Sequence, residues 1–301
     1  MKFSVIIPTY DRDVELLRAV RSVLTQTHPN LEVIVVDDAG RIDARQELAV
    51  IEDERLRVHR LDANGGANRA RNHGISVSTG HILCFLDSDD EWEPNRLADL
   101  LSHIESVGGD QPAIFSCKLK FQRSVDYFDV KPAVTIRPDE RVFTYLMCND
   151  GLLQTSTLAY ARDFGDALRF DESHRVHDDY GLVIRAQDIG FRFLVDEKAN
   201  AIWHQENNRG RVSIARNRKK YLDWYRDYKK YMNRNERIAY KFVHISKLYD
   251  LSVFFNAMKC FIFRAMKPKK IVLYTLRAAL PLPLYLKACL LIKSSGVGRF
   301  R

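Results

Sequence analysis

Short apolar runs alternate with amphipathic helical patterns along the first hundred residues, and this alternation restricts the possible folds more than any other feature. Residues 14–24 repeat apolar side chains every three or four positions, as one face of a helix requires. Strands that alternate with helices are typical of βαβ units, so we predict an α/β fold with a mixed, mostly parallel sheet flanked by helices. The four runs with strand character are Ser4–Ile7, Val33–Val36, Arg57–Leu61 and Ile82–Leu86.

Length and composition are those of a folded protein. The 301 residues are 46% hydrophobic and 29% charged, which argues against disorder and allows one large α/β domain plus an appendage. The five cysteines never form a Cys-x-x-Cys pair, so we expect neither a disulfide framework nor a zinc site, and a reducing compartment is favoured. The chain begins directly with a predicted strand, without the pattern of a signal peptide.

Charge divides the chain into two parts. Residues 1–206 contain 24 Lys and Arg against 35 Asp and Glu, whereas residues 207–301 contain 23 against 4. The net charges of the two parts are therefore −11 and +19. An acidic body with a basic tail indicates two different tasks, so we predict a domain over residues 1–206 and a basic helical extension over residues 207–301.

Three carboxylates follow the fourth apolar run within four residues, at Asp87, Asp89 and Asp90. Like charges this close repel and raise each other's proton affinity, so a fold keeps them together only with a compensating cation. A hard divalent metal, which prefers oxygen ligands and often shares them with substrate phosphates, is the obvious candidate. The alternative is an acidic turn that caps a helix beginning near Pro94.

Ligands gather at the carboxyl ends of the strands in open sheets of this type. The motif Gly-x-Gly-x-x-Gly does not follow the first strand, and Gly-Lys-Ser/Thr is absent, so neither a dinucleotide oxidoreductase nor a P-loop protein is indicated. The residues predicted at this edge are Thr9, Tyr10, Asp37, Asp38, Asn64 and Asp87 to Asp90.

Beyond residue 107 the alternation loosens. We predict helices over residues 141–148 and 178–187, with Asp178 and Asp179 at the start of the second. The strands predicted in this part cover residues 113–121, 154–160, 191–195 and 199–204.

The basic tail has an apolar component as well. Aromatic residues are interleaved with bases as far as Tyr240, and residues 253–266 and 271–292 are more apolar. No run reaches the roughly 18 apolar residues of a spanning helix. We therefore predict helices in the membrane interface, with Trp, Tyr and Phe at the headgroup level and Lys and Arg facing anionic lipids. Packing on the body or a dimer interface is the alternative.

Five motifs follow one another along residues 1–206: SVIIPTY (4–10), VVDD (35–38), NGGxxxARNxG (64–74), FLDSDDxWxP (85–94) and Asp178-Asp179. Their order is that of family 2 glycosyltransferases, and residues 1–206 resemble that family. The resemblance implies a GT-A fold, inversion at the anomeric carbon, a nucleotide-sugar-binding half over residues 1–100 and an acceptor half over residues 101–206. The tail resembles the variable extensions of bacterial polysaccharide-building members.

The resemblance assigns roles to the matching positions. Arg71 is expected to reach a phosphate or the base, since a guanidinium offers a fork of donors, with a solvated helix-face arginine as the alternative. For Asp37 and Asp38 the alternative is helix capping. The residues implied in binding the donor nucleotide and sugar are Pro8, Thr9, Tyr10, Asp37, Asp38, Asn64, Arg71, Asp87 and Ser88.

A metal and a base complete the expected site. The resemblance makes Asp89 the main ligand of Mn²⁺ or Mg²⁺, with Asp87 beside it and His204 as a further metal or phosphate contact. A structural histidine is the alternative for His204. Asp90 could cap the next helix.

Asp179 matches the catalytic base of the family, which takes the proton of the acceptor hydroxyl. A helix N-terminus favours its ionised form, while the charge of Asp178 opposes it. The family more often has Glu-Asp here, so Asp178 stays open as the base, and simple helix capping is the alternative for both. For Trp92, a core residue is favoured over a wall that stacks on the sugar.

The function expected from these residues is that of an inverting glycosyltransferase at the cytoplasmic face of the membrane. It would move a sugar from a nucleotide-diphosphate donor, with UDP favoured, to a glycan or lipid-linked acceptor, and would bind an anionic membrane surface but no nucleic acid. One rival is a sugar nucleotidyltransferase, whose Gly-rich loop is missing after the first strand. The others are a nucleic-acid-binding protein that uses the basic tail and a non-catalytic sugar-binding module.

Overall fold

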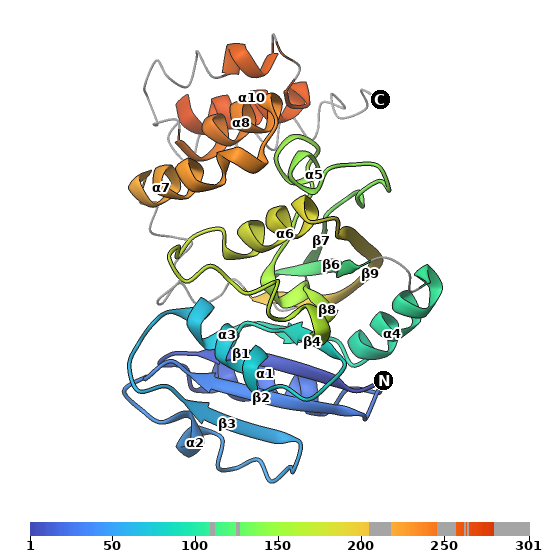
Figure 1. Cartoon of the computed structure of the whole chain (residues 1–301), viewed down its shortest axis with the longest axis vertical. Helices are drawn as coiled ribbons and strands as arrows, with labels where there is room; N and C mark the ends of the chain where they lie inside the picture. The colour runs from blue at the N-terminus through green and yellow to red at the C-terminus, as the bar shows by residue number, and fades with distance from the viewer. Residues whose placement is uncertain are drawn as a thin grey trace. The chain divides into compact units, whose positions relative to one another are not determined.

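The computed structural model describes residues 1–108, 112–124, 127–204, 218–245, 257–261, 263 and 265–279. The chain divides into two compact units, one formed by residues 1–142 and 152–215 and the other by residues 143–151 and 216–301. The first contains the sheet, and in the second the described elements are helical (Figure 1). The predicted boundary at residue 206 lies outside the described residues. The assignment of residues 143–151 to the second unit was not foreseen from the sequence.

A mixed sheet forms the centre of the first unit. Within the described residues its strand order is β3-β2-β1-β4-β8-β6-β9-β5, and β7 pairs with β6. Strands β3, β2, β1 and β4 are parallel, as are β6 and β9, whereas β8, β5 and β7 join their neighbours in antiparallel pairs. The predicted mixed α/β sheet is confirmed. The strands are β1 (Phe3–Thr9), β2 (Leu31–Asp37), β3 (Leu56–Arg60), β4 (Ile82–Phe85), β5 (Glu91–Trp92), β6 (Ala113–Ser124), β7 (Tyr127–Lys131), β8 (Ala159–Ala161) and β9 (Arg192–His204).

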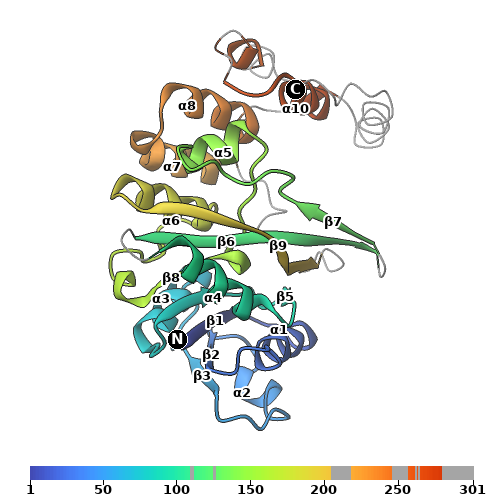
Figure 2. The ribbon, with the colours of Figure 1, turned by 90° about the vertical axis from the view of Figure 1, so that its right-hand side faces the viewer.

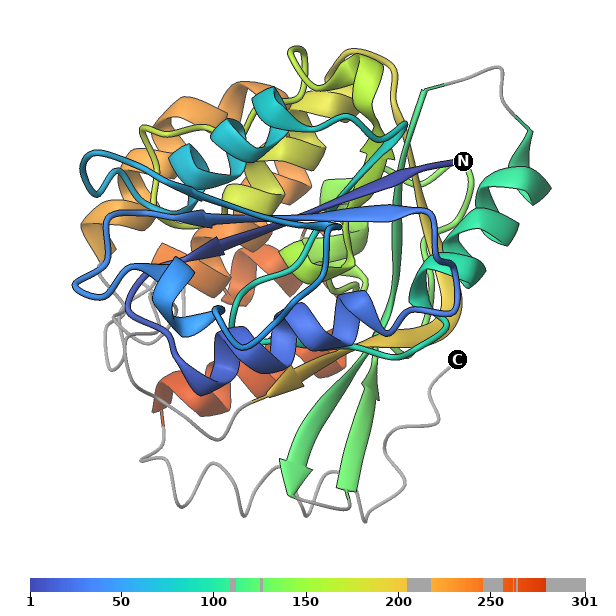
Figure 3. The same cartoon turned by 90° about the horizontal axis from the view of Figure 1, so that it is seen from below.

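Helices cover both faces of the first strands. Figure 3 shows α1 and α3 on opposite sides of β1 and β2, so these strands are buried throughout. Helix α3 approaches β1 closely at Gly74, where an added Cβ atom would lie 2.4 Å from Ile6 Cγ2. Asp13 is the N-cap residue of α1, and its side chain accepts a hydrogen bond from the Val14 amide. The helices of this unit are α1 (Val14–Leu24), α2 (Ala44–Glu47), α3 (Ala67–Val77), α4 (Arg96–Val107) and α6 (Asp178–Asp188).

The register of the sheet brings the strand ends to one edge. Thr9 at the end of β1 pairs with Asp37 at the end of β2, and Ile6 pairs with Phe85 at the end of β4. The residues that follow these strands therefore meet above the same edge.

Three predicted strands differ from the structure. Within residues 154–160, Thr155–Thr157 form a short 3-10 turn and the strand begins only at Ala159. The Gln154 side chain accepts from the Ser156 backbone amide, and the Thr157 hydroxyl donates to the Gln154 carbonyl. These backbone groups therefore bond to side chains instead of to a neighbouring strand. The two strands predicted after residue 190 form one continuous strand, β9, beside β6 (Figure 2).

The second unit has an aromatic core. Trp224 is fully buried and stacks on Tyr228, with ring centroids 4.5 Å apart, and its ring also contacts Tyr240 and Phe143. These aromatic side chains are core residues, so their predicted place at the headgroup level is wrong. No described helix is long and apolar enough to cross a membrane. The helices are α5 (Val142–Cys148), α7 (Arg218–Tyr228), α8 (Arg234–Tyr240) and α10 (Pro268–Ala279). Parts of the predicted segments 253–266 and 271–292 lie outside the described residues.

Candidate active site

Asp38 holds the glycine loop that precedes α3. Its two carboxylate oxygens accept hydrogen bonds from the backbone amides of Gly65 and Gly66, at 2.8 and 2.7 Å. Gly66 has a φ of +92°, a conformation that side chains disfavour, so a glycine is required there. Asp38 therefore fixes the loop before α3 without capping the helix, which has no side-chain cap, so the capping alternative is wrong for Asp38. Its buried carboxylate fixes one wall of the strand-end edge.

Asp37 is also fully engaged. It accepts from the Gly40 amide at 2.8 Å and from the amide of Ala44, the first residue of α2, at 3.2 Å. Its charge is paired with Arg60 at 2.6 Å. The structure thus gives Asp37 a loop-building role, and a direct contact with the donor stays a prediction.

The end of β1 offers polar groups to a ligand. Pro8 and Thr9 are buried, while Tyr10 is about half exposed, at 48%. The Thr9 hydroxyl is buried without a hydrogen-bond partner among the described residues, which marks it as a group that a ligand could satisfy. Asn64 is exposed at the start of the glycine loop.

Arg71 lies at the centre of the site. Its guanidinium donates to Asp87 Oδ1 at 2.7 Å and to Asp178 Oδ2 at 2.5 Å, and it packs over the Phe170 ring. Burial by itself would lower the pKa of Arg71, but the charges of the two carboxylates outweigh it and raise that pKa. The alternative of a solvated helix-face arginine is wrong, since the residue is 3% exposed. Contact with a phosphate or the base stays a prediction.

The polar face of α3 also fixes the segment that leads to α6. Asn72 donates to the Phe170 carbonyl and accepts from the Phe170 amide, at 2.9 and 2.8 Å. Asn68 donates to the carbonyls of Asp171 and His174. Two side chains of the motif NGGxxxARNxG thus hold the chain before Asp178, a role that the motif alone did not reveal.

Each carboxylate after β4 has its own environment. Asp87 and Asp89 are about a quarter exposed, with Asp87 facing Arg71 and Asp89 Oδ2 lying 3.5 Å from Arg12 Nη2. Arg18 donates to the Asp89 carbonyl at 2.7 Å. Burial and the charge of Asp89 raise the pKa of Asp87, against the effect of Arg71. Ser88, between the two aspartates, is buried.

Asp90 is a buried structural residue. Its Oδ2 atom accepts from the Ser156 hydroxyl at 2.6 Å and from the side-chain amide of Gln154. Burial together with the charge of Asp89 raises the pKa of Asp90 well above the usual range. Asn95, instead of Asp90, precedes α4, so the predicted capping role is wrong. Trp92 is 2% exposed, which confirms it as a core residue.

His204 lies at the end of β9 with both ring nitrogens occupied. Nε2 is 2.9 Å from Glu91 Oε2, and Nδ1 contacts Gln122 Oε1. The contact with His204 lowers the pKa of Glu91. To bind a metal, His204 would first have to release one of these partners, so the structural alternative fits the geometry better.

Helix α6 presents the predicted base. His177, with a left-handed φ of 55°, begins the helix and stacks on Tyr180. Asp178 is bound to Arg71, whereas Asp179 Oδ1 accepts only from the Tyr180 amide, at 2.8 Å, among the contacts of the described residues. Burial and the neighbouring Asp178 raise the pKa of Asp179 well above its ordinary value. A half-buried carboxylate with a raised pKa suits a general base.

The structure thus brings Asp87, Arg71 and Asp178 into one ion-pair network. Asp89 lies two residues after Asp87 in the chain, and Asp179 directly follows Asp178. Among the described residues, no three His, Cys, Asp or Glu side chains converge as a complete metal cage. The partners Arg12, Arg18 and Ser156 were missed from the sequence, because no local pattern marks a side chain that acts on a distant strand end.

Comparison with known proteins decides the family. The family model "Glycosyl transferase family 2" matches residues 4–150. The amylovoran biosynthesis glycosyltransferase AmsB of Erwinia amylovora is 32% identical over 250 residues, which cover 80% of this chain and 82% of AmsB. The chain belongs to glycosyl transferase family 2.

Two further proteins align over similar lengths. The putative colanic acid biosynthesis glycosyl transferase WcaA of Escherichia coli is 26% identical, over 79% of this chain and 84% of WcaA. Among solved structures, that of S. aureus TarS 1-349 in complex with UDP-GlcNAc covers 92% of this chain and 79% of that one, with a TM-score of 0.61 and 19% identity. This likeness confirms the predicted GT-A-like fold of the glycosyltransferase.

The first prediction concerns Arg71 in this family 2 enzyme. Arg71→Gln leaves Asp87 and Asp178 without their shared cation, so the free energy of unfolding should fall by about 2–4 kcal/mol. Urea denaturation measures this loss. The control is Arg69→Gln, an exposed position on the same helix, which should change stability by no more than about 0.5 kcal/mol. Equal effects of the two substitutions would contradict the central role of Arg71.

Proposed function

We propose that this enzyme transfers a sugar, with inversion, from a UDP-linked donor to a hydroxyl of a glycan or lipid-linked acceptor. The observation that carries the proposal is the Arg71 bridge, which holds Asp87 at the end of β4 next to Asp178 at the start of α6. The Arg71 bridge holds the edge that would bind the donor close to a carboxylate that can act as a base. This suits direct displacement, because the donor sugar and the acceptor hydroxyl must be aligned.

A divalent cation fits the first part of this site. Asp87 and Asp89 are partly exposed oxygen donors, the ligand type that Mg²⁺ and Mn²⁺ prefer. One or two carboxylates without a complete cage match a cation that takes its other ligands from a diphosphate and water. Bound there, the cation would supply positive charge to stabilise the departing nucleotide diphosphate.

Asp179 is the proposed base, because it is the carboxylate of α6 that Arg71 does not occupy. Its raised pKa makes it a better proton acceptor than an ordinary aspartate, while Asp178 is held in an ion pair with Arg71. In the reaction, Asp179 takes the proton of the acceptor hydroxyl as that oxygen attacks the anomeric carbon, and the bond from this carbon to the diphosphate oxygen breaks to release UDP. Arg71 holds the end of β4 and the start of α6 in place for this step.

The names of the relatives support the acceptor class. AmsB and WcaA are described as enzymes of amylovoran and colanic acid biosynthesis, and the TarS crystals contained UDP or UDP-GlcNAc. We therefore propose a role in the assembly of a bacterial cell-surface polysaccharide, with a UDP-sugar as the donor, at the cytoplasmic face of the membrane.

The second prediction tests the donor site. Asp89→Ala removes one carboxylate while Arg12 and Arg18 remain, so Mn²⁺-dependent binding of UDP should be lost and the far-UV circular dichroism should stay unchanged. Isothermal titration of UDP with and without Mn²⁺ measures this. Glu15→Ala, which removes the other carboxylate near Arg12, is the control and should keep metal-dependent binding. Equal UDP affinity with Mn²⁺ and with excess chelator would refute the metal assignment.

The third prediction tests the base. Asp179→Asn keeps the shape but cannot accept a proton, so turnover should fall by roughly 10²–10⁴-fold with little change in donor affinity. Because a base acts only when ionised, wild-type kcat/KM should fall as the pH drops through the raised pKa of Asp179. Asp178→Asn removes a charge that raises the pKa of Asp179. In this variant, the fall of kcat/KM on the acidic side of the pH profile should therefore move to lower pH. If Asp178→Asn is the inactive variant instead, Asp178 is the base.

Membrane association has support in the second unit. Four apolar side chains are exposed on residues 257–279, and the guanidinium of Arg234 lies 4.1 Å from the centre of the Phe263 ring. Lys259 and Lys267 are exposed in the same segment. Exposed apolar residues among bases match a surface that inserts shallowly between anionic headgroups. The four residues are Met258, Phe261, Phe263 and Val272.

The fourth prediction tests this surface. Replacing Met258 and Phe261 together by serine should weaken binding to anionic phosphatidylglycerol vesicles at least about ten-fold, because two apolar side chains no longer leave water. Vesicle sedimentation of the full chain measures it, and high salt should weaken wild-type binding. The control replaces Ile42 and Val50, equally exposed apolar residues of the first unit, by serine. Unchanged sedimentation of the first double variant would refute the membrane contact.

A further inference from the structure

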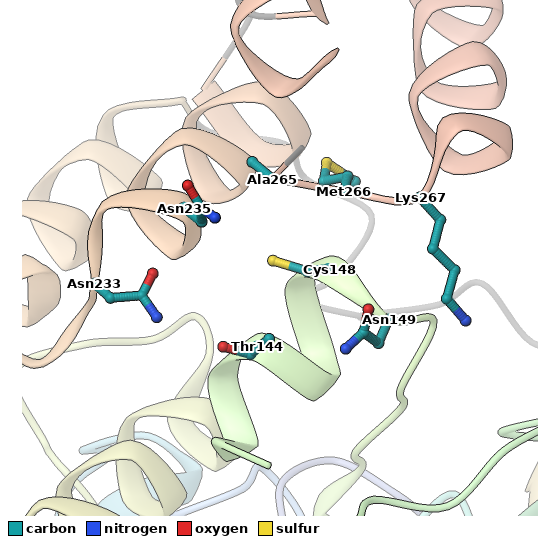
Figure 4. Close-up of a pocket in the computed structure, with 8 residues that line it drawn as sticks. All are labelled: Thr144, Cys148, Asn149, Asn233, Asn235, Ala265, Met266 and Lys267. Carbon is teal, nitrogen blue, oxygen red and sulfur yellow. The ribbon is translucent and has the colours of Figure 1, made fainter. Parts of the chain in front are cut away.

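The second unit contains a pocket with a mixed polar and apolar lining that the proposed reaction does not use. Its volume is about 330 Å³, at the lower end of the roughly 300–1,000 Å³ typical of small-molecule sites. Figure 4 shows its walls, which come from α5, the start of α8 and the turn before α10. The lining residues are Thr144, Cys148, Asn149, Asn233, Asn235, Ala265, Met266 and Lys267.

An internal network fixes the orientation of two pocket groups. Glu236, fully buried, accepts from the Thr144 hydroxyl at 2.7 Å and from the Asn233 backbone amide at 2.7 Å. The Asn233 side-chain oxygen in turn accepts from the Glu236 amide. Asn233 therefore has its NH₂ group left to donate, and the Thr144 oxygen keeps capacity to accept. Both are held in place before any ligand arrives.

Two further pocket groups, the side-chain amide of Asn235 and the ammonium of Lys267, have no hydrogen-bond or ion-pair partner among the described residues. Figure 4 shows the Lys267 side chain running past Asn149 with its ammonium turned away from the other lining residues, so this flexible side chain has to rotate to meet a ligand in the pocket. The lining thus offers amide donors and acceptors, one cation and no carboxylate. Ala265 and Met266 add a small apolar surface.

We propose that this pocket is a second saccharide-binding site, for a sugar that carries a carboxylate or phosphate. Amide and hydroxyl groups match the alternating donors and acceptors of sugar hydroxyls, and the apolar wall matches the C–H face of the ring. Lys267 provides the charge for the oxyanion, where a charge-assisted hydrogen bond is stronger than a neutral one. The site would hold part of an acidic glycan apart from the reacting sugar. It requires neither the donor nor the base assignment made above.

The fifth prediction is a binding experiment on the full chain with glucuronate, glucose 6-phosphate, glucose and inorganic phosphate. By saturation-transfer NMR titration, glucuronate or glucose 6-phosphate should bind at least about five-fold more tightly than glucose. Lys267→Gln should abolish this preference, and Asn235→Ala should weaken all three sugars. The control Lys259→Gln removes an equal charge outside the pocket and should leave binding unchanged. Thermal melting verifies that each variant is folded.

Three results would overturn the proposal. The first is equal binding by wild type and Lys267→Gln. The second is binding of inorganic phosphate as tight as that of the charged sugars, which would indicate a simple anion site. The third is loss of sugar binding in Asp179→Asn, which would place the bound sugar in the catalytic site. Because the readout is binding, failure here leaves the proposed transfer reaction intact.

Discussion

The contact between Arg71 and its two carboxylates is the interaction on which the site depends. A buried guanidinium is costly unless it is paired, and Asp87 and Asp178 provide the pairing from two segments far apart in the chain. The same contact lets two negative side chains lie close together on one shared cation. It therefore fixes the distance between the end of β4 and the start of α6, which no backbone hydrogen bond between them secures among the described residues.

The acidic residues after β4 are tolerated because each is compensated differently. Asp87 faces Arg71, Asp89 lies near Arg12, and Asp90 is buried with hydrogen bonds from Ser156 and Gln154 and a raised pKa. A single cation could not neutralise all three at once. This arrangement leaves Asp87 and Asp89 partly open, so they remain the carboxylates available to a substrate-bound metal.

The second unit follows a different principle. Its core is a stack of aromatic rings around Trp224, and the segment after Val142 contributes Phe143 to it. Most of its bases stay on the outside, together with exposed residues such as Phe261. The composition of the tail predicted its aromatic side chains at a membrane. The structure divides the described ones between a buried core and an exposed surface, and only those on the surface are available to a partner.

The sequence by itself determined the elements and the edge at which they meet, because periodicity and turn residues are local and parallel strands end on one side. It identified Asp87, Asp89 and Asp179 as candidates, but it could not assign partners to them. Arg71 contacts Asp178 across 107 residues, and Ser156 reaches Asp90 across 66, so only the tertiary structure decided these pairs. The tertiary structure likewise decided that His204 bonds to Glu91 and Gln122, and that Asp90 is buried, since burial and pairing depend on segments that no local pattern connects.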